Sequence, residues 1–269
     1  MKTRLGEKRN GMVRGLYTAY TGMLNQQNKM DLISNNLANA ATTGYKKEGV
    51  TSKSFDTQLA IKVKDGSTGY VNQQIGKLNL GVKIGENYTD YSQGAYENTG
   101  NTYDVALDGE GFLTISFMNK SGEESVKYTR DGNFTVDSDG ALRTQDGDYV
   151  LGEGGQIYIP TNAADVSIGK LGDIYADGQY IDTLKITEFE DYNYLRKYGE
   201  NMYETVDGAT EKESSAVVNQ GYLEASNVNA VTEMVNMISL SRTYEANQKV
   251  IRSMDEELQR SANQIGKIG

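Results

Sequence analysis

Apolar residues recur every seven positions at both ends of the chain. Near the start, the repeat comprises Leu16, Met23, Met30 and Leu37, with Ile33 in an intervening position. Near the end, it comprises Met237, Tyr244, Ile251, Leu258 and Ile265, with Met254 three residues after Ile251. A seven-residue repeat describes a narrow helical stripe, typical of a helix that packs on another helix. The pattern predicts two assembly helices, over residues 12–45 and 225–269, and these stripe residues as an assembly interface.

Amide side chains accompany both helices. Asn35, Asn36 and Asn39 lie near the end of the first helix, and Asn227 and Asn229 lie at the start of the second. An amide both donates and accepts hydrogen bonds without bringing net charge into a contact. We expect these five residues to satisfy backbone and partner groups where the helices meet the connecting chain, and we include them in the assembly interface.

The middle of the chain has the pattern of an all-β domain. Hairpin turns are predicted at four Asp-Gly pairs, and another turn at residues 108–111; the pairs begin at Asp131, Asp139, Asp146 and Asp177. Turn signals about 8–12 residues apart are typical of a small barrel or sandwich, here over residues 99–190. Residues 46–98 read as an extended connector with short strands, such as 69–75 and 82–84. Residues 191–224 read as an irregular return segment, and residues 1–11 as a polar tail.

Together these elements predict an α+β chain. Its paired N- and C-terminal helices, in a coiled-coil-like arrangement, would flank the inserted β domain and its connector. A second arrangement fits the periodicity equally well, with both helices packed inside one monomer. Gln26, Asn247 and Ser261 interrupt the stripes. Such interruptions weaken an isolated helix pair but can set the register of a multi-helix assembly.

Composition excludes several classes of protein. The chain has 269 residues and a net charge of -10, which argues against a nucleic-acid partner that needs a basic face. It contains no cysteine and no histidine, so disulfides, thiolate nucleophiles and the commonest general base are all absent. No apolar run approaches the roughly 18 residues of a membrane span, so we expect no membrane insertion. Residues 1–11 lack the apolar segment of a secretory signal peptide.

The candidate chemical motifs are weak. A calcium loop needs a ligand at the third position, where residues 104–109 have Ala106, so the Asp-Gly sites read as turns. The glycines at 109–111 and 152–155 lack the third glycine of a dinucleotide loop. Glu188, Glu190 and Asp191 could supply the carboxylate pair of a glycosidase, but 37 acidic residues make such a cluster expected by chance. We predict no enzyme, no catalytic residue, no cofactor and no metal. A cell-wall-acting hydrolase and an extracellular binding module remain the alternatives.

Four blocks of the sequence carry a family resemblance. Residues 34–47 read SNNLANAATTGYKK, residues 99–112 read TGNTYDVALDGEGF, residues 128–134 read YTRDGNF, and residues 226–251 begin SNVNAV. In this order the blocks resemble the signatures of bacterial flagellar rod and hook proteins, in particular the basal-body rod subfamily. The block at 99–112 lacks the proline often found there, at Asn101-Thr102. Residues 1–11 have no counterpart in the family, and Met12 offers a second possible translation start.

The resemblance implies a structural subunit of the flagellar rod, a self-assembling helical polymer that serves motility. In that family the terminal helices form the inner layer of a tube that transmits torque to the hook. The partners implied are further copies of the chain, other rod and hook proteins, and the flagellar type III export apparatus. The location implied is the basal body, on the periplasmic side of the inner membrane after export. The length suits either the distal rod protein or its close relative in the proximal rod, and we favour the distal type.

Family members also tend to carry an export motif after the first helix, a phenylalanine followed four residues later by an apolar residue. Phe55 and Leu59 fit this spacing. A buried apolar pair explains the same two residues equally well.

Overall fold

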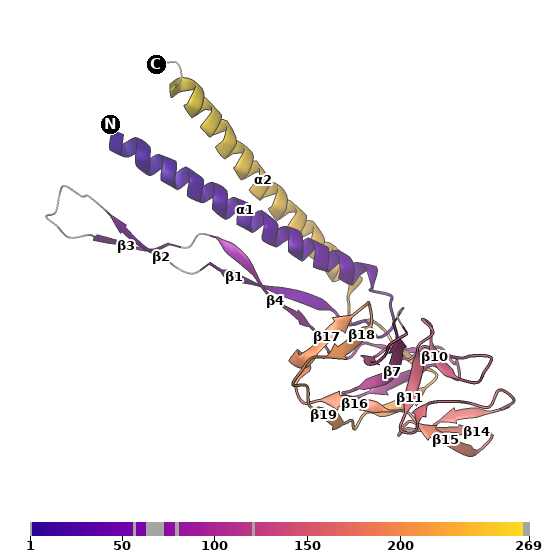
Figure 1. Ribbon diagram of the computed structural model, residues 1–269. Helices are drawn as coiled ribbons and strands as arrows, with labels where there is room; N and C mark the ends of the chain where they lie inside the picture. The colour runs from indigo at the N-terminus through magenta and orange to yellow at the C-terminus, as the bar shows by residue number, and fades with distance from the viewer. Residues whose placement is uncertain (1, 56–57, 63–72, 79–80, 120–121, 266–269) are drawn as a thin grey trace. The chain divides into compact units, whose positions relative to one another are not determined.

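The computed structural model describes residues 2–55, 58–62, 73–78, 81–119 and 122–265. Over these residues the protein is α+β, as predicted, with two long α-helices and many short strands (Figure 1). The chain divides into two compact units. Unit 1 consists of residues 1–37, 48–89 and 230–269, and unit 2 consists of residues 38–47 and 90–229.

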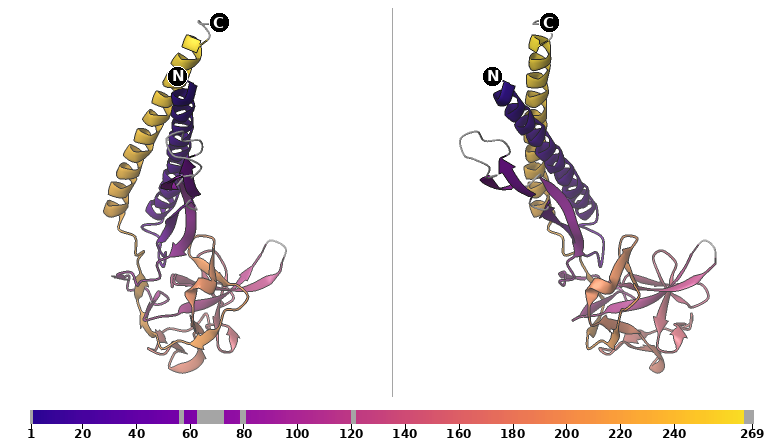
Figure 2. Two further views of the ribbon diagram at one scale, coloured as in Figure 1. Left: turned by 90° about the vertical axis from the view of Figure 1, so that its left-hand side faces the viewer. Right: turned by 60° about the vertical axis from the view of Figure 1, so that its left-hand side comes forward.

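Unit 1 contains both long helices, α1 (Lys2–Ala38) and α2 (Ala230–Ile265), which Figure 2 shows from two further sides. α1 begins ten residues before the predicted start at residue 12. Lysine, arginine and glutamate favour a helix over residues 2–10, and no proline interrupts it. α1 ends at Ala38 rather than at residue 45, because the chain turns there. The Thr42 amide donates to the Asn39 carbonyl at 3.2 Å, and Gly44 has a positive φ of 66°.

α2 begins five residues after the predicted start at residue 225. The Val228 amide donates to Ser226 Oγ at 3.2 Å, and Asn227 Oδ1 accepts a hydrogen bond from the Lys47 amide at 2.7 Å. Such bonds between side chains and backbone compete with helix formation. Residues 225–229 therefore follow a non-helical path, and the helix starts after them.

The predicted connector contains two antiparallel ribbons in unit 1. β1 (Glu48–Ser54) pairs with β4 (Val82–Thr89), from Glu48 opposite Thr89 to Ser54 opposite Val82. β2 (Gln58–Lys62) pairs with β3 (Gln73–Leu78). The predicted strand at 82–84 is the beginning of β4, whereas residues 69–72 of the other predicted strand lie outside the described residues. Periodicity alone did not reveal that these segments fold back on each other.

Unit 2 is built on one large antiparallel sheet. Its main path runs β17 (Leu195–Tyr198), β18 (Met202–Thr205), β8 (Glu124–Thr129), β7 (Phe112–Met118), β11 (Tyr149–Gly152), β10 (Leu142–Thr144) and β9 (Phe134–Val136). Beside this path, β12 (Gly155–Gln156) pairs with β11, and β16 (Ile186–Phe189) pairs with β7 and with β19 (Glu211–Glu213). Separate small sheets comprise β13 (Val166–Ile168), β14 (Asp173–Ala176) and β15 (Gln179–Thr183); β6 (Val105–Asp108) with β20 (Val217–Gln220); and β5 (Tyr96–Asn98) with β21 (Tyr222–Glu224).

Residues 191–224 are not the irregular return segment that the sequence suggests. They contain the short 3₁₀ helix η1 (Tyr192–Tyr194) and the strands β17 to β21. Leu195, Tyr203 and Val218 of these strands are buried. Each strand has only three or four residues, which is too short for an alternating pattern to stand out. The β domain therefore needs this segment to be complete.

Three of the four predicted Asp-Gly hairpins are confirmed. Asp139-Gly140 joins β9 to β10, Asp146-Gly147 joins β10 to β11, and Asp177-Gly178 joins β14 to β15. Asp177 and Gly178 have φ values of 51° and 79°, the left-handed conformation that a two-residue hairpin loop requires. Asp131-Gly132 is no hairpin, because β8 and β9 are not paired. The Gly132 carbonyl instead accepts a hydrogen bond from the Val105 amide at 3.0 Å.

Two groups of buried side chains stabilise unit 2. The larger group is aliphatic and includes Val105, Leu113, Val150 and Ile174. The smaller is mainly aromatic and consists of Phe112, Tyr128, Phe189 and Tyr203 with Leu195. The Tyr128 and Phe189 rings meet edge to face at 4.9 Å between centroids, a favourable geometry for aromatic pairs. Unit 2 thus has a core of its own.

Candidate functional site

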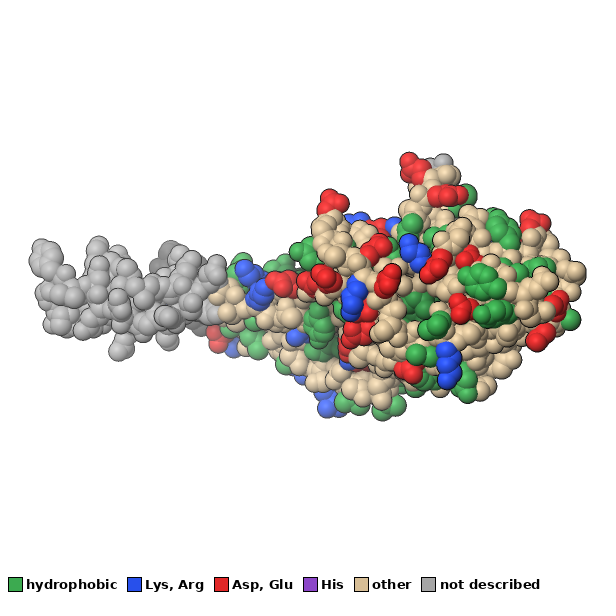
Figure 3. Space-filling model, turned by 90° about the horizontal axis from the view of Figure 1, so that it is seen from below, with side chains coloured by type: hydrophobic (Ala, Val, Ile, Leu, Met, Phe, Trp, Pro, Cys, Tyr) green, Lys and Arg blue, Asp and Glu red, His purple; other side chains and the backbone are tan. Residues whose placement is uncertain are grey.

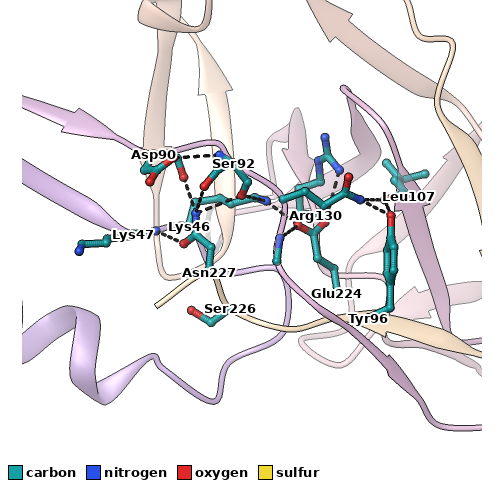
Figure 4. Close-up of polar contacts among 12 residues, drawn as sticks. Lys46, Lys47, Asp90, Ser92, Tyr96, Leu107, Arg130, Glu224, Ser226 and Asn227 are labelled. Carbon is teal, nitrogen blue, oxygen red and sulfur yellow. Dashed lines mark hydrogen bonds and ion pairs between the residues drawn. The ribbon is translucent and has the colours of Figure 1, made fainter. Parts of the chain in front are cut away.

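Unit 2 contains a buried ionic cluster. Two of its residues lie close to positions where the chain crosses between the units: residue 46 is next to the end at 47, and residue 224 is near the end at 229. The cluster comprises Lys46, Arg130 and Glu224, whose side chains converge in Figure 4. Lys46 follows the turn after α1, Arg130 follows β8, and Glu224 ends β21. All three are buried, with exposed fractions of 1%, 5% and 1%. Charged side chains are seldom buried so fully unless they are paired.

Glu224 connects the cluster. Its Oε1 lies 2.5 Å from Lys46 Nζ, and its Oε2 lies 3.3 Å from Arg130 Nη1. The Gly94 amide also donates to Glu224 Oε1, at 2.9 Å. Lys46 Nζ donates a second hydrogen bond to the Ser92 carbonyl at 2.8 Å, and Arg130 Nη2 donates to the Gly109 carbonyl at 2.7 Å. These bonds join five separate stretches of the chain.

The charges of the cluster depend on this pairing. Burial lowers the pKa of Lys46, while the neighbouring Glu224 carboxylate opposes that effect. The nearby Asp90 has a lowered pKa, chiefly because its carboxylate accepts a hydrogen bond from the Ser92 amide. Two buried cations face one buried anion, so removal of that anion would leave two charges uncompensated.

Asn227 ties the same segments together through its amide. Its Oδ1 accepts from the Lys47 amide, and its Nδ2 donates to the Asp90 carbonyl at 2.8 Å and the Ser92 carbonyl at 3.1 Å. Lys47 and Asp90 are end residues of unit 2 segments, and Asn227 lies two residues before another such end. The chain crosses between the units at four positions, 37/38, 47/48, 89/90 and 229/230. The cluster and Asn227 therefore fix the backbone of unit 2 next to the last three of these positions.

This arrangement is suited to holding the backbone, not to chemistry. The three charged groups are sealed from solvent and engaged with one another. Within the described ranges, no group of acidic side chains could hold a metal ion, and no helix has the length and apolarity of a membrane span. On the face that Figure 3 shows, acidic and basic side chains are interspersed and form no broad basic patch.

Among the amides singled out from the sequence, Asn36 has a defined role in unit 1. Its side chain is buried, and it makes two hydrogen bonds to the backbone of Glu48: Oδ1 accepts from the amide at 3.0 Å, and Nδ2 donates to the carbonyl at 2.8 Å. Asn36 thereby attaches the start of β1 to the end of α1. Asn39 is buried in unit 2, where its Oδ1 accepts from Thr42 Oγ1 at 3.1 Å. Asn35 and Asn229 are exposed.

The predicted stripe residues keep part of their surface open to solvent. Those that are half-buried are Leu16, Met23, Met30, Ile33, Leu37, Met237, Tyr244, Ile251 and Met254, whereas Leu258 is exposed. Two glycines of α1 lie close to α2 side chains within unit 1. A methyl group added at Gly15 would lie 2.5 Å from Met254 Cε, and one added at Gly22 would lie 3.3 Å from Asn247 Nδ2.

The export motif is described only in part. Phe55 is half-buried, and its ring centroid lies 6.4 Å from that of Tyr17. Leu59 belongs to β2, but its side chain lies outside those that the structure describes. The export motif at Phe55 and Leu59 therefore stays a prediction, with a buried apolar pair as its alternative.

Sequence reasoning missed the ionic cluster. Lys46 and Glu224 are 178 positions apart, and no local pattern connects them. It also missed a second apolar face on α2, formed by Val231, Met234, Val235 and Ile238, all exposed. Their spacing of three, four and seven positions is a helical signal that could have been found.

Comparison with known proteins agrees with this architecture. Residues 16–46 match the model of the flagella basal body rod protein family. Residues 106–176 match the flagellar hook protein FlgE/F/G D1 domain, and residues 219–265 match the flagellar basal body rod FlgEFG protein C-terminal domain. The flagellar basal-body rod protein FlgG of Bacillus subtilis is 38% identical over 94% of this chain and 99% of its own length. The chain belongs to the flagellar basal-body rod protein family.

Other relatives of this rod protein carry related names. The flagellar basal-body rod protein FlgF of Caulobacter vibrioides is 34% identical over 96% of this chain and 100% of its own. The flagellar hook-basal body complex protein FlhO of Bacillus subtilis is 28% identical over 96% of this chain and 100% of its own. The predicted family is therefore confirmed, and with it a structural protein of the flagellar basal body rather than an enzyme. The wall-hydrolase and binding-module alternatives have no support.

Proposed function

We propose that this rod protein polymerises through α1 and α2 into the tubular shaft of the rod and transmits torque to the hook. The observation that carries the proposal is the contrast between the two units. Among the described side chains of unit 1, Ala19 is the one hydrophobic residue that is buried, whereas unit 2 has two buried clusters. Two long helices without a core of their own are stabilised by burying their stripes against other subunits.

We further propose that α1 and α2 pair in a coiled-coil-like manner. Gly15 approaches Met254, and Gly22 approaches Asn247. From the first contact to the second, the position moves seven residues forward along α1 and seven residues back along α2. This spacing is that of an antiparallel helix pair with heptad periodicity. Glycines at these points allow the larger side chains of α2 to come close. In this arrangement the half-buried stripe residues become the contacts between subunits.

The partners of this assembly are further copies of the chain, other rod and hook proteins, and the flagellar type III export apparatus. The absence of cysteine supports export in an unfolded state, because no disulfide can form during passage. Asn35, Asn36, Asn39, Asn227 and Asn229 act where the helices meet the connecting segments. The length suits either the distal or the proximal rod, and we favour the distal rod.

Electron microscopy of basal bodies from a strain that lacks this gene tests the proposal. We expect a truncated rod without a hook, and a stub that includes the proximal segment would support the distal assignment. The matched control is the same strain carrying the intact gene, which should regain complete rods. Complete, rotating flagella in the deletion strain would contradict the proposal.

A further inference from the structure

Unit 1 has an open groove between α1 and the β1–β4 ribbon. Its volume is about 300 Å³, and its apolar lining consists of Leu32, Val50 and Ile84. Ile84 is 44% exposed, so this lining is open to solvent. Asp31 is the charged residue of the lining, and Asn28, Asn35 and Asn87 supply amides around it. The groove thus combines an apolar floor with one negative charge.

The second apolar face of α2 has a complementary character. Val231 and Val235 are 70% and 61% exposed, and Met234 and Ile238 lie beside them. At about 100° per residue, this face is turned by roughly 130° around α2 from the stripe of Met237, Tyr244 and Ile251. A hollow of about 440 Å³ on the same face is lined by Val235, Ile238 and Ala246 with Ser239, Thr243 and one charged residue, Arg242.

The two surfaces match in two respects. Each has an apolar strip, and each has a single lining charge, negative in the groove and positive on α2. Both belong to unit 1, and both are exposed in the same chain. The chain's own α2 therefore does not fill the groove, and the occupant must come from another molecule.

We propose that the second face of α2 in one copy docks into the α1–ribbon groove of another copy, with Arg242 facing Asp31. This inference rests on the proposed function, because it names the contact by which the subunits polymerise. The two surfaces differ, so each copy offers one of each. Such a head-to-tail contact does not close into a symmetric dimer, and it continues into a ring or an open helical filament.

A charge exchange tests this contact in the full-length protein. Asp31→Arg or Arg242→Asp alone would place like charges opposite each other, which disfavours a contact. We expect each single variant to lower the number of complete rods per cell on the order of tenfold, because like charges weaken every copy of the contact. The double variant Asp31→Arg/Arg242→Asp should restore the wild-type number. Circular dichroism of each purified variant would establish that its helices and strands are intact.

Cysteine crosslinking gives a second test, since the chain has no cysteine of its own. Two differently tagged copies would be produced together in rods, one with Val235→Cys and the other with Asn87→Cys. We expect an oxidative crosslink between the two tags. The control pair, Glu213→Cys of unit 2 with Asn87→Cys, should give none.

The outcomes separate the contact from the proposed function. Normal rods in both single charge variants, or folded double variants without rescue, would overturn the contact and leave the structural role in place. Absence of the wild-type chain from purified basal bodies would overturn both. Rescue by the double variant together with the predicted crosslink would establish the contact.

Discussion

Glu224 is the residue on which the buried cluster of unit 2 depends. It pairs with Lys46 and Arg130 and also accepts a hydrogen bond from the Gly94 amide. A buried ion pair adds little stability by itself, because desolvation offsets the attraction between the charges. Its loss is costly, since the remaining partners stay buried without compensation. The cluster therefore selects one path for the chain more than it strengthens the fold.

Glu224→Gln should lower the free energy of unfolding of unit 2 by about 3–5 kcal/mol, because two cations would remain buried without an anion. Urea unfolding followed by far-ultraviolet circular dichroism measures this loss. Glu97→Gln is the matched control, since Glu97 lies on β5 next to β21 and is exposed. Its effect should stay within about 0.5 kcal/mol. Equal effects of the two substitutions would contradict the role assigned to Glu224.

Tyr128 should make unit 2 sensitive to high pH. Burial raises the pKa of Tyr128 above its usual value, and the hydrogen bond from its hydroxyl to Glu211 adds to this shift. The folded protein therefore retains the phenolic proton that the unfolded chain loses near pH 10, as unperturbed tyrosines do. The stabilisation is complete below about pH 10 and is lost as the pH rises further.

Tyr128→Phe should accordingly weaken the fall in stability above about pH 10, because it removes one group that titrates only on unfolding. The free energy of unfolding, measured from pH 8 to 11.5 for both proteins, tests this. At pH 8, the variant should lose about 1 kcal/mol through the missing hydrogen bond. Parallel pH profiles for variant and wild type would show that Tyr128 does not contribute to the dependence.

Among the elements, the turn after α1 shows how a single glycine positions a segment. Gly44 has a φ of 66°, and its amide donates to the Glu224 carbonyl at 2.8 Å. A methyl group at this position would lie 2.4 Å from the Arg130 carbonyl carbon and from the Asp131 amide nitrogen. Both neighbours belong to the backbone and cannot rotate away. The turn therefore requires glycine for its conformation and for its close approach.

Gly44→Ala should destabilise unit 2 by more than Gly100→Ala. Gly100 has a similar φ of 69°, but an added methyl group there would contact nothing within 4 Å. Gly100→Ala should lower the free energy of unfolding by about 1–2 kcal/mol, because alanine disfavours the left-handed conformation. Gly44→Ala should lower it further, because the added methyl group also clashes with backbone atoms. Thermal unfolding of the two variants measures the difference. Similar melting temperatures would mean that the chain next to Arg130 can shift at little cost.

The helices lead to a prediction about assembly. Leu37→Asp and Ile251→Asp should abolish rod formation, because each places a charge in a stripe that assembly is proposed to bury. Unit 2 should stay folded, since its core contains neither residue. Basal-body microscopy and a swimming assay measure the effect, and Leu37→Met and Ile251→Leu are the matched apolar controls. Normal swimming of either aspartate variant would contradict the assembly role of its stripe.

At the scale of the whole molecule, the two units differ in how they are stabilised. Unit 2 buries aliphatic and aromatic clusters between its sheets. Unit 1 places long helices beside two-stranded ribbons, and an isolated ribbon is only marginally stable in water. The purified subunit should therefore open locally in unit 1 well before unit 2 unfolds.

Limited proteolysis of the purified full-length chain tests this difference. We expect early loss of both terminal helices and a resistant core made of the strands of unit 2, within residues 90–229, because backbone with few buried contacts opens most readily. Mass spectrometry would identify the fragments. Helices that stay intact as long as unit 2 does would contradict this difference in stability between the units.

Much of this protein could be predicted from the order of its residues. The heptad stripes predicted two long helices, three of the four predicted Asp-Gly hairpins are present, and four blocks indicated the rod family. These signals are local, since helix periodicity and turn conformation depend on neighbouring residues. The boundaries were less accurate: α2 starts late because Asn227 accepts a hydrogen bond from the Lys47 amide, 180 positions away, and that bond depends on the folded chain.

The rest depended on distant parts of the chain meeting. Lys46 and Glu224 are 178 positions apart, and only the fold brings Lys46 Nζ to 2.5 Å from Glu224 Oε1. The strands within residues 191–224 are stable because β8, β16 and β6 pair with them, and their short sequences carry little preference of their own. Likewise, the heptad spacing alone does not determine which apolar residues of a stripe remain exposed to solvent in the folded chain. Burial and pairing are properties of the folded chain, and the function proposed for its helices follows from what the chain leaves uncovered.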